Sequence, residues 1–283
     1  MSTGAAPGVD RCPLCDGQGR AFRRKAGYPI LRCAACDVAF VPPRLVPDDL
    51  ESLYSRAYFE GDADTGYPGY LADGAILRKN FADRLAFVER VGCPGPRLLD
   101  VGAAYGLLLL EARARGFEPE GVEIAPDCAE EAARLSGARV ACGSFVDVPL
   151  EGPYDVIVML DVIEHFRDPL AAMRRAHELL VRGGLLVMET GDMDSRWARA
   201  AADRWHFLDP PQHLFYFGLE GMKRTLRTAG FTSEIAVKRA SRRVSVNNLA
   251  FKLAARLPGG AARRGLQAAV RRGLPGSVHL NLW

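Results

Sequence analysis

The sequence lacks any long apolar run. No stretch reaches the about 18 apolar residues that a membrane-spanning helix needs, and the first 13 residues contain no apolar core of a signal peptide. These absences exclude the membrane-spanning class, and we expect a cytoplasmic protein whose cysteines stay reduced. No internal repeat is evident, so the 283 residues suggest one or two globular domains.

Acidic residues are missing from the C-terminal end. From residue 235 onwards the chain has ten Lys or Arg and no Asp or Glu. Such asymmetry is compatible with an acidic partner, a membrane surface or a phosphate-bearing substrate. We favour a solvated basic face on a helical insertion at about 241–275, because charge runs usually serve solvation alone. The insertion would cover an acceptor site or mediate homodimerisation.

A Walker loop is also absent, although residues 97–123 contain a glycine turn. A predicted strand ends at Asp100, the turn runs from Gly102 to Gly106, and a second strand closes on Glu123. The spacing is DVGxxxG, with no Lys-Ser or Lys-Thr after it. Carboxylates around such a turn suit a cationic ligand better than a diphosphate. S-adenosylmethionine carries a sulfonium and an ammonium, so the turn indicates a methyl-donor site.

Strands and helices alternate after this turn. The apolar runs at 140–145, 154–160 and 183–190 predict strands, and the periodic segments at 126–136 and 168–181 predict helices. A helix at 219–229, a strand at 231–240 and a last strand at 277–283 follow. This order predicts an α/β fold with a parallel sheet.

The chain resembles the class I S-adenosylmethionine-dependent methyltransferases over about residues 75 to 240. The segments that match, in order, are LLDVGAAYG (98–106), VEI (122–124), GSFVDVP (143–149), YDVIVMLDVIEHFRDP (154–169) and LVRGGLLVMET (180–190). The resemblance implies a Rossmann-like, doubly wound sheet of seven strands, the last antiparallel. It also implies that Gly102, Ala103 and Gly106 line the methionine moiety of the donor, above Asp100. Glu123 would accept hydrogen bonds from both ribose hydroxyls.

Five more residues complete the donor site by the same resemblance. Ile124 would lie against the adenine. Ser144 stands where the family commonly has an acid that binds the adenine amino group, and Phe145 would pack beside it. Asp161 would lie at the floor of the pocket, and Tyr70 is a candidate lid residue.

Four of the seven cysteines form two CxxC pairs. Cys12 and Cys15 are separated by seventeen residues from Cys33 and Cys36, a spacing typical of a structural zinc site. Such a site contributes on the order of 10–16 kcal/mol of folding free energy to a small segment. Two disulfides would conflict with a reducing compartment, and a redox pair is less favoured.

A zinc ribbon before a methyltransferase resembles two arrangements, the deoxysugar C-methyltransferases and a set of ribosomal RNA guanine methyltransferases. The presence of a zinc ribbon therefore does not decide whether the substrate is a small molecule or RNA. We expect three segments: a zinc ribbon at 1–45, a helical lid or cap at 46–95, and the methyltransferase core with its basic insertion at 96–283.

Acid and imidazole groups follow two of the predicted strands. Were the chain helical after the fourth strand, Asp161, Glu164 and His165 would share one face. With His213 they resemble the divalent-metal ExxEH sites of small-RNA 2′-O-methyltransferases and ubiquinone-pathway O-methyltransferases. The segment 213–231 also resembles the EHLSYF-type segment of the deoxysugar enzymes, which places His213 on their proposed general base. Three roles stay open for His213: catalytic base, ligand of Mg²⁺ or another divalent metal, or a cap of the following helix.

The sequence therefore predicts an S-adenosylmethionine-dependent methyltransferase. The acceptor would be a hydroxyl, or an activated carbon, of a small molecule or sugar, with natural-product or glycan tailoring as the setting. The alternative is an RNA methyltransferase that uses the ribbon and the basic C-terminal segment. The scarcity of aromatic residues in that segment counts against RNA binding.

Overall fold

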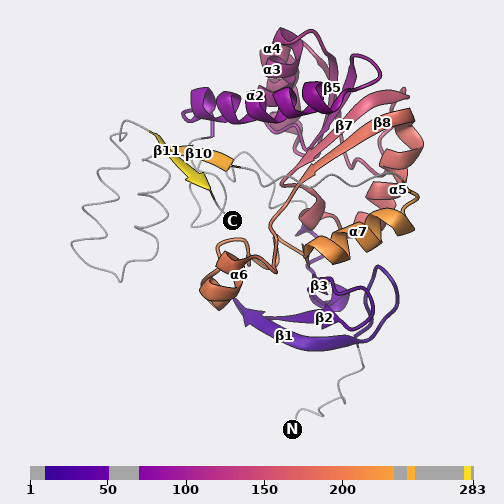
Figure 1. The fold of residues 1–283 in the computed structure, drawn as a ribbon, viewed down its shortest axis with the longest axis vertical. Coiled ribbons are helices and arrows are strands. Elements are labelled where there is room, and N and C mark those ends of the chain that lie inside the picture. The colour runs from indigo at the N-terminus through magenta and orange to yellow at the C-terminus, as the bar shows by residue number, and fades with distance from the viewer. Residues whose placement is uncertain (1–9, 51–69, 233–240, 246–276, 282–283) are drawn as a thin grey trace, which may run out of the picture. The chain divides into compact units, whose positions relative to one another are not determined.

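The computed structural model describes residues 10–50, 70–232, 241–245 and 277–281. The chain divides into two compact units. The glycine-loop unit comprises residues 53–144 and 238–282, and the ribbon unit comprises residues 1–52 and 145–237 together with Trp283. In Figure 1 the glycine-loop unit contains α2 to α4, and the ribbon unit contains β1 to β3.

Three parallel strands and three helices make up most of the described part of the glycine-loop unit. They are α2 (Gly74–Val91), β4 (Arg97–Val101), α3 (Leu107–Ala114), β5 (Glu118–Glu123), α4 (Pro126–Ser136) and β6 (Arg139–Cys142). Strand β5 pairs with β4 on one side and with β6 on the other. The neighbouring side chains Leu98 and Leu99 point to opposite faces of β4, and both are fully buried. Both faces of this strand are therefore covered, as a parallel sheet requires.

Glycines determine where α3 and α4 meet. Gly106 precedes α3 at a φ of 74°, and a Cβ atom there would lie 2.9 Å from the backbone of Ala132 in α4. Both the backbone conformation and the close approach favour glycine. Helix α4 has proline in its first turn and ends at Gly137 in the left-handed conformation, so its predicted bounds of 126–136 are confirmed.

The ribbon unit contains a second α/β segment. Strands β7 (Tyr154–Leu160) and β8 (Leu180–Glu189) are parallel, and α5 (Pro169–Leu179) connects them. The side chain of Asp168 starts α5 by accepting a hydrogen bond from the amide of Ala171. The remaining helical elements are η1 (Pro43–Leu45), η3 (Ile163–His165), α6 (Arg196–Ala201), η4 (Ala202–Arg204) and α7 (Leu219–Thr228).

The strands of this α/β fold follow the order β6-β5-β4-β7-β8 in one sheet. The predicted fold class is confirmed, but the described part of the sheet has five strands where seven were expected. Most of the predicted strand at 231–240 lies outside the described residues. The last predicted strand is present as β11 (Ser277–Asn281), and it pairs antiparallel with β10 (Ser241–Ser245) in a two-stranded sheet.

Helix α2 holds the edge of β10. The buried amide of Asn80 donates to the carbonyl of Arg243 at 2.9 Å and accepts from its amide at 2.8 Å. Arg243 also pairs with Asp83 one turn further along α2. These bonds satisfy edge groups of β10 that a further strand would otherwise take, which explains why β10 and β11 form a sheet of their own.

A four-stranded antiparallel sheet gives the ribbon unit its name. Its order is β1 (Gly19–Lys25), β2 (Tyr28–Cys33), β3 (Ala39–Phe40) and β9 (Phe215–Tyr216). One apolar cluster lies against it, built by residues from both ends of the unit, namely Ile30, Ala39, Val41, Met193, Ala198, Trp205, Leu208 and Tyr216. Residues 30–41 thus share one core with residues 193–216.

The predicted division into segments 1–45, 46–95 and 96–283 stays a prediction. Most of the basic insertion at 241–275 lies outside the described residues. Of the helices that are described, none is both long and apolar enough to cross a membrane.

Candidate active site

The glycine turn after β4 has an unusual backbone. Gly102, Ala104 and Gly106 all have positive φ angles, of 78°, 47° and 74°. The amides of Gly102 and Ala103 donate to the carbonyl of Val122 at 2.8 and 3.0 Å, which holds the turn against β5. Alternating left-handed residues expose backbone amides on one side of a turn, and such a turn accommodates a ligand at close range.

Glu123 fixes this turn from the end of β5. It is 5% exposed, and its two carboxylate oxygens accept hydrogen bonds from the amides of Ala104 at 2.8 Å and Ala125 at 2.9 Å. Burial raises the pKa of Glu123, and the backbone hydrogen bonds oppose that rise. A carboxylate has about four acceptor positions, more than these backbone amides occupy.

Asp100, in β4 directly before the turn, is buried as well. It is 4% exposed. Burial, and secondly the negative charge of Glu123, raise the pKa of Asp100 to about 7. Two buried carboxyl groups that repel each other are stabilised by a cation placed near them. This electrostatic environment fits the predicted positively charged donor.

The other predicted donor residues divide between the two units. Ile124 and Ser144 are half-buried in the glycine-loop unit. There Tyr70 also packs against Tyr105, with ring centroids 5.8 Å apart. Tyr105 is buried inside the turn itself, and sequence reasoning assigned it no role, although its place between Gly102 and Gly106 was a signal.

Phe145 and Asp161 belong to the ribbon unit. Phe145 is buried and packs edge-on against Phe166 at 6.3 Å, with the Arg175 guanidinium 5.7 Å from its ring. Asp161 directly follows β7 with a φ of 51°, and its amide donates to the carbonyl of Glu189 at 2.8 Å. The left-handed conformation at Asp161 ends the strand abruptly, so the expected helix after it is replaced by the single 3-10 turn η3.

Glu164, His165 and His213 come together beyond this turn. Each offers one ligand atom, and the three atoms lie within 4.8 Å of one another. The two imidazole rings meet edge to face at 4.7 Å. Glu164 is fully buried, and one of its carboxylate oxygens accepts a hydrogen bond from the Thr190 hydroxyl at 3.0 Å. Asp161, predicted as a fourth member, is not part of this group of three.

Backbone carbonyls orient both imidazoles. His165 Nδ1 lies 2.9 Å from the carbonyl oxygen of Gln212, and His213 Nδ1 lies 2.6 Å from that of Phe207. A carbonyl oxygen only accepts, so in the neutral His213 ring Nδ1 carries the proton and Nε2 has the lone pair. Sequence reasoning gave Thr190, Phe207 and Gln212 no part in orienting this cluster, because Phe207 and Gln212 act through backbone atoms that no side-chain pattern reveals.

Burial keeps both rings neutral. It is the main cause that lowers the pKa of His213 well below its ordinary value, and the neighbouring charge of His165 lowers it further. Burial also lowers the pKa of His165, while its hydrogen bond to Gln212 opposes the shift. A neutral Nε2 can accept a proton or bind a metal ion. The third role, a helix cap, does not fit, because α7 begins after Gly218 and without a side-chain cap.

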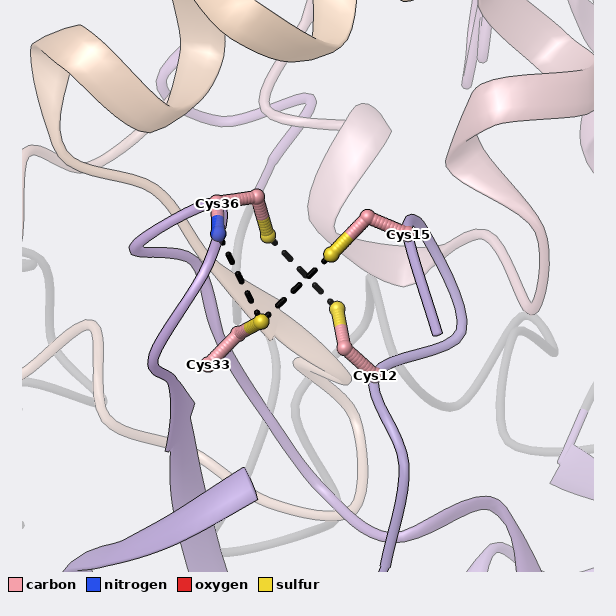
Figure 2. Close-up of side chains that lie close together, drawn as sticks. All are labelled: Cys12, Cys15, Cys33 and Cys36. Atoms are coloured by element: carbon pink, nitrogen blue, oxygen red, sulfur yellow. Dashed lines mark hydrogen bonds between the residues drawn. The ribbon is translucent and has the colours of Figure 1, made fainter. Parts of the chain in front are cut away.

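The four predicted zinc ligands converge at the other end of the ribbon unit. The Sγ atoms of Cys12 and Cys36 lie 3.6 Å apart, and those of Cys15 and Cys33 lie 3.5 Å apart. Figure 2 shows that these two lines cross between the four sulfurs. A disulfide needs sulfurs about 2.05 Å apart, whereas tetrahedral zinc with bonds of about 2.3 Å places them about 3.8 Å apart. The geometry therefore fits zinc and not disulfides.

The environment of the thiols also fits a cation. Burial is the main cause that raises the pKa of Cys15 to about 11, and hydrogen bonds with Cys33 and Cys36 add to it. The amides of Ala35 and Cys36 approach the sulfur of Cys33 at 3.4 and 3.5 Å. A bound metal ion would stabilise the thiolates that burial otherwise disfavours.

Comparison with known proteins identifies the family and the fold. A family model described as a methyltransferase domain matches residues 74–234. The YcgJ protein from Bacillus subtilis shares the fold, with a TM-score of 0.51 and 16% sequence identity, over 70% of this chain and 85% of that one.

Curated relatives match a shorter segment. A ubiquinone biosynthesis O-methyltransferase from Xanthomonas campestris is 37% identical over 117 residues, which cover 38% of this chain and 48% of that protein. A protein of the same description from Pseudomonas aeruginosa is 29% identical over 124 residues, 40% of this chain and 50% of that protein. The chain thus spans about half the length of the curated relatives it matches.

Proposed function

Because the chain belongs to the methyltransferase-domain family, we propose that it transfers the methyl group of S-adenosylmethionine to a small molecule or sugar. The observation that carries the proposal is the pair of buried acids, Asp100 and Glu123, beside a turn with three left-handed residues. The acids favour a cationic donor. The turn gives its backbone room to approach that donor closely.

A hydroxyl group is the favoured acceptor, with an activated carbon as the second choice. The curated relatives are named O-methyltransferases of ubiquinone biosynthesis. An oxygen nucleophile must lose its proton during the in-line displacement of the methyl group from sulfur. A buried carboxylate and two neutral imidazoles suit that requirement. Natural-product or glycan tailoring is the setting we propose for it.

His213 is the central residue of the proposed acceptor chemistry. Its Nε2 carries the lone pair, and the bond from Nδ1 to Phe207 keeps the ring in one orientation. As a general base, it would take the hydroxyl proton directly. As a metal ligand, it would act with Glu164 and His165 to hold a divalent ion, which would lower the pKa of a bound hydroxyl.

The four-cysteine centre has a structural role in this proposal. Zinc with four thiolate ligands has no open position, so it offers no site for substrate. Cys12, Cys15, Cys33 and Cys36 would hold the ion, and the ion would stabilise two turns in a segment with few residues of its own core.

Donor binding is the direct test. Calorimetry with adenosylhomocysteine on the full chain should give saturable binding, and NAD should give none. An absence of affinity for adenosylhomocysteine would contradict the proposal. Turnover of labelled donor with candidate phenols, catechols and sugars then identifies the acceptor class, and chelation at a level that preserves zinc distinguishes a base from a metal site.

The RNA alternative has a separate test. Binding through a basic segment falls steeply as salt rises, because cations are released from the nucleic acid. Purified protein that carries RNA, with an affinity that falls as salt is raised, would favour an RNA acceptor. An RNA-free preparation without such affinity would exclude it.

A further inference from the structure

The sheet of the ribbon ends in the strand that follows His213. In β9, Tyr216 pairs with Ala39 and Phe215 pairs with Phe40, both in β3. The amide of Val41 continues the ladder by donating to the carbonyl of Leu214 at 2.9 Å. A backbone ladder thus connects the N-terminal ribbon to the residue directly after His213.

Leu214 also bonds to the acid of the cluster. Its amide donates to the carbonyl of Glu164 at 2.8 Å. The two peptide groups of Leu214 therefore face in two directions, one towards the ribbon and one towards η3. The hydroxyl of Tyr216 adds a bond of 3.0 Å to the carbonyl of His213 itself.

The second cysteine pair controls where β3 begins. Only two residues separate Cys36 from β3, and the amide of Cys33 donates to the carbonyl of Val38 at 2.9 Å. Helix α7 contacts the turn at Cys33–Cys36, because Arg224 donates a hydrogen bond to the carbonyl of Ala35 at 2.7 Å. Displacing the turn would therefore displace β3.

These contacts distinguish the ribbon from an independent module. A module joined by a linker has its own core, whereas here Ile30 and Val41 share one apolar cluster with Trp205 and Tyr216. The ring of Trp205 stacks on Phe207 at 5.4 Å, and Phe207 accepts the hydrogen bond from the His213 ring. Both side-chain packing and backbone hydrogen bonds therefore connect the ribbon to the His213 imidazole.

We propose that the four-cysteine centre is a positioning element for the Glu164–His165–His213 cluster. Metal bound at the cysteines fixes the turn, the turn fixes β3, and β3 fixes Leu214 and His213 through β9. Leu214 and Val41 are the positioning residues, and they act through their peptide groups. The catalytic meaning of the coupling rests on the proposed function, but the coupling itself can be measured without turnover.

The test breaks the backbone hydrogen bond between Val41 and Leu214 while it leaves the four cysteines unchanged. Proline at position 41 removes the amide that donates to Leu214, and Phe40 before it is already extended, as a residue before proline must be. The matched control Val41→Ala keeps the amide and loses side-chain packing alone. Both variants are prepared as full chains with ¹³C-labelled histidine, and their zinc content is measured after desalting.

In Val41→Pro we expect zinc to stay bound while the ring signals of His213 and His165 shift or broaden. His177, in α5 and packed against Phe231, should keep its signal. Val41→Ala should match the wild type. Unchanged His213 and His165 signals in Val41→Pro would overturn the proposal, and so would an equal change at His177, which would mean general loss of structure.

Two further measurements complete the test. Stepwise removal of zinc from the wild type should reduce the His213 signal in proportion to the zinc lost, and a chain that takes up no zinc would overturn the proposal. Tyr216→Phe should shift His213 alone, whereas Tyr28→Phe, at a residue packed against the same apolar cluster, should not. The affinity of the wild type for adenosylhomocysteine is recorded in parallel, because its absence would contradict the proposed function and leave the coupling intact.

Discussion

The two candidate sites of this protein are assembled in different ways. Asp100 and Glu123 lie on adjacent strands within 24 consecutive residues, and Glu123 accepts hydrogen bonds from Ala104 in the turn and from Ala125 just after β5. The imidazole cluster brings together residues 164 and 213, and its backbone is joined to strand β3 near the N-terminus. A local site depends on turn chemistry, whereas an assembled site depends on every segment that supports it.

Replacing His213 should have the largest effect, because it removes the central residue of the assembled site. We expect His213→Ala to reduce turnover by about 10² to 10⁴-fold, because a positioned base contributes about that much, while affinity for adenosylhomocysteine stays unchanged. His206→Ala, a histidine seven residues earlier in the same segment, is the control. Turnover of labelled donor measures the effect. A loss of donor affinity in His213→Ala would show that the two sites are not separable.

Glu123→Ala should weaken donor binding, in contrast to His213→Ala, which should lower turnover and leave donor binding unchanged. The carboxylate holds the turn through Ala104 and Ala125, and hydrogen bonds to a charged group contribute about 1.5–3 kcal/mol each. We expect adenosylhomocysteine affinity to fall by about 10-fold or more for each hydrogen bond to a ribose hydroxyl that is lost, as measured by calorimetry. Glu118→Ala, at the exposed start of the same strand, should bind normally. Equal affinities in the two variants would refute a donor role for Glu123.

The stability of the glycine-loop unit should depend on pH through Asp100. Its pKa is about 7 when folded and 3.8 when unfolded, so between these values the folded state holds the extra proton. Stability without donor should therefore fall as pH rises from about 4 to about 7, by up to about 1.4 kcal/mol per pH unit, and level off above. Asp100→Asn should flatten this slope in chemical denaturation. Donor affinity should rise over the same pH range, because ionised Asp100 attracts a cation.

Gly106→Ala tests the close contact between the turn and α4. It combines a left-handed backbone with a Cβ only 2.9 Å from Ala132, whereas Gly116 has a φ of 86° and open space around it. Strain alone costs on the order of 1–3 kcal/mol, and overpacking adds about 1–3 kcal/mol in Gly106→Ala. The difference between the two variants in urea unfolding isolates the clash. Equal losses would mean that α3 and α4 move apart freely.

The contrast between a local site and an assembled site also explains which features could be predicted from the sequence. Helix 126–136 and strand 154–160 have the predicted bounds, because proline, glycine and a continuous apolar run mark them locally. The pairing of Glu164 with His213 was anticipated through a resemblance. Its supports were not, since Phe207 and Gln212 act through carbonyl groups, and nothing in the letters 39–40 and 215–216 marks them as partners. Asp161 adopts a left-handed conformation where a helical turn was considered, and no local residue pattern indicates that.

The pairing of β3 with β9 also has a consequence for how the molecule is made. All four cysteines leave the ribosome before residue 40, but the strand that completes their sheet follows some 175 residues later. A nascent chain can therefore capture its metal early while one edge of the ribbon stays unpaired. Contacts so distant along a polypeptide form slowly, and until β9 arrives the open edge of β3 is a place where two unfinished chains could join each other.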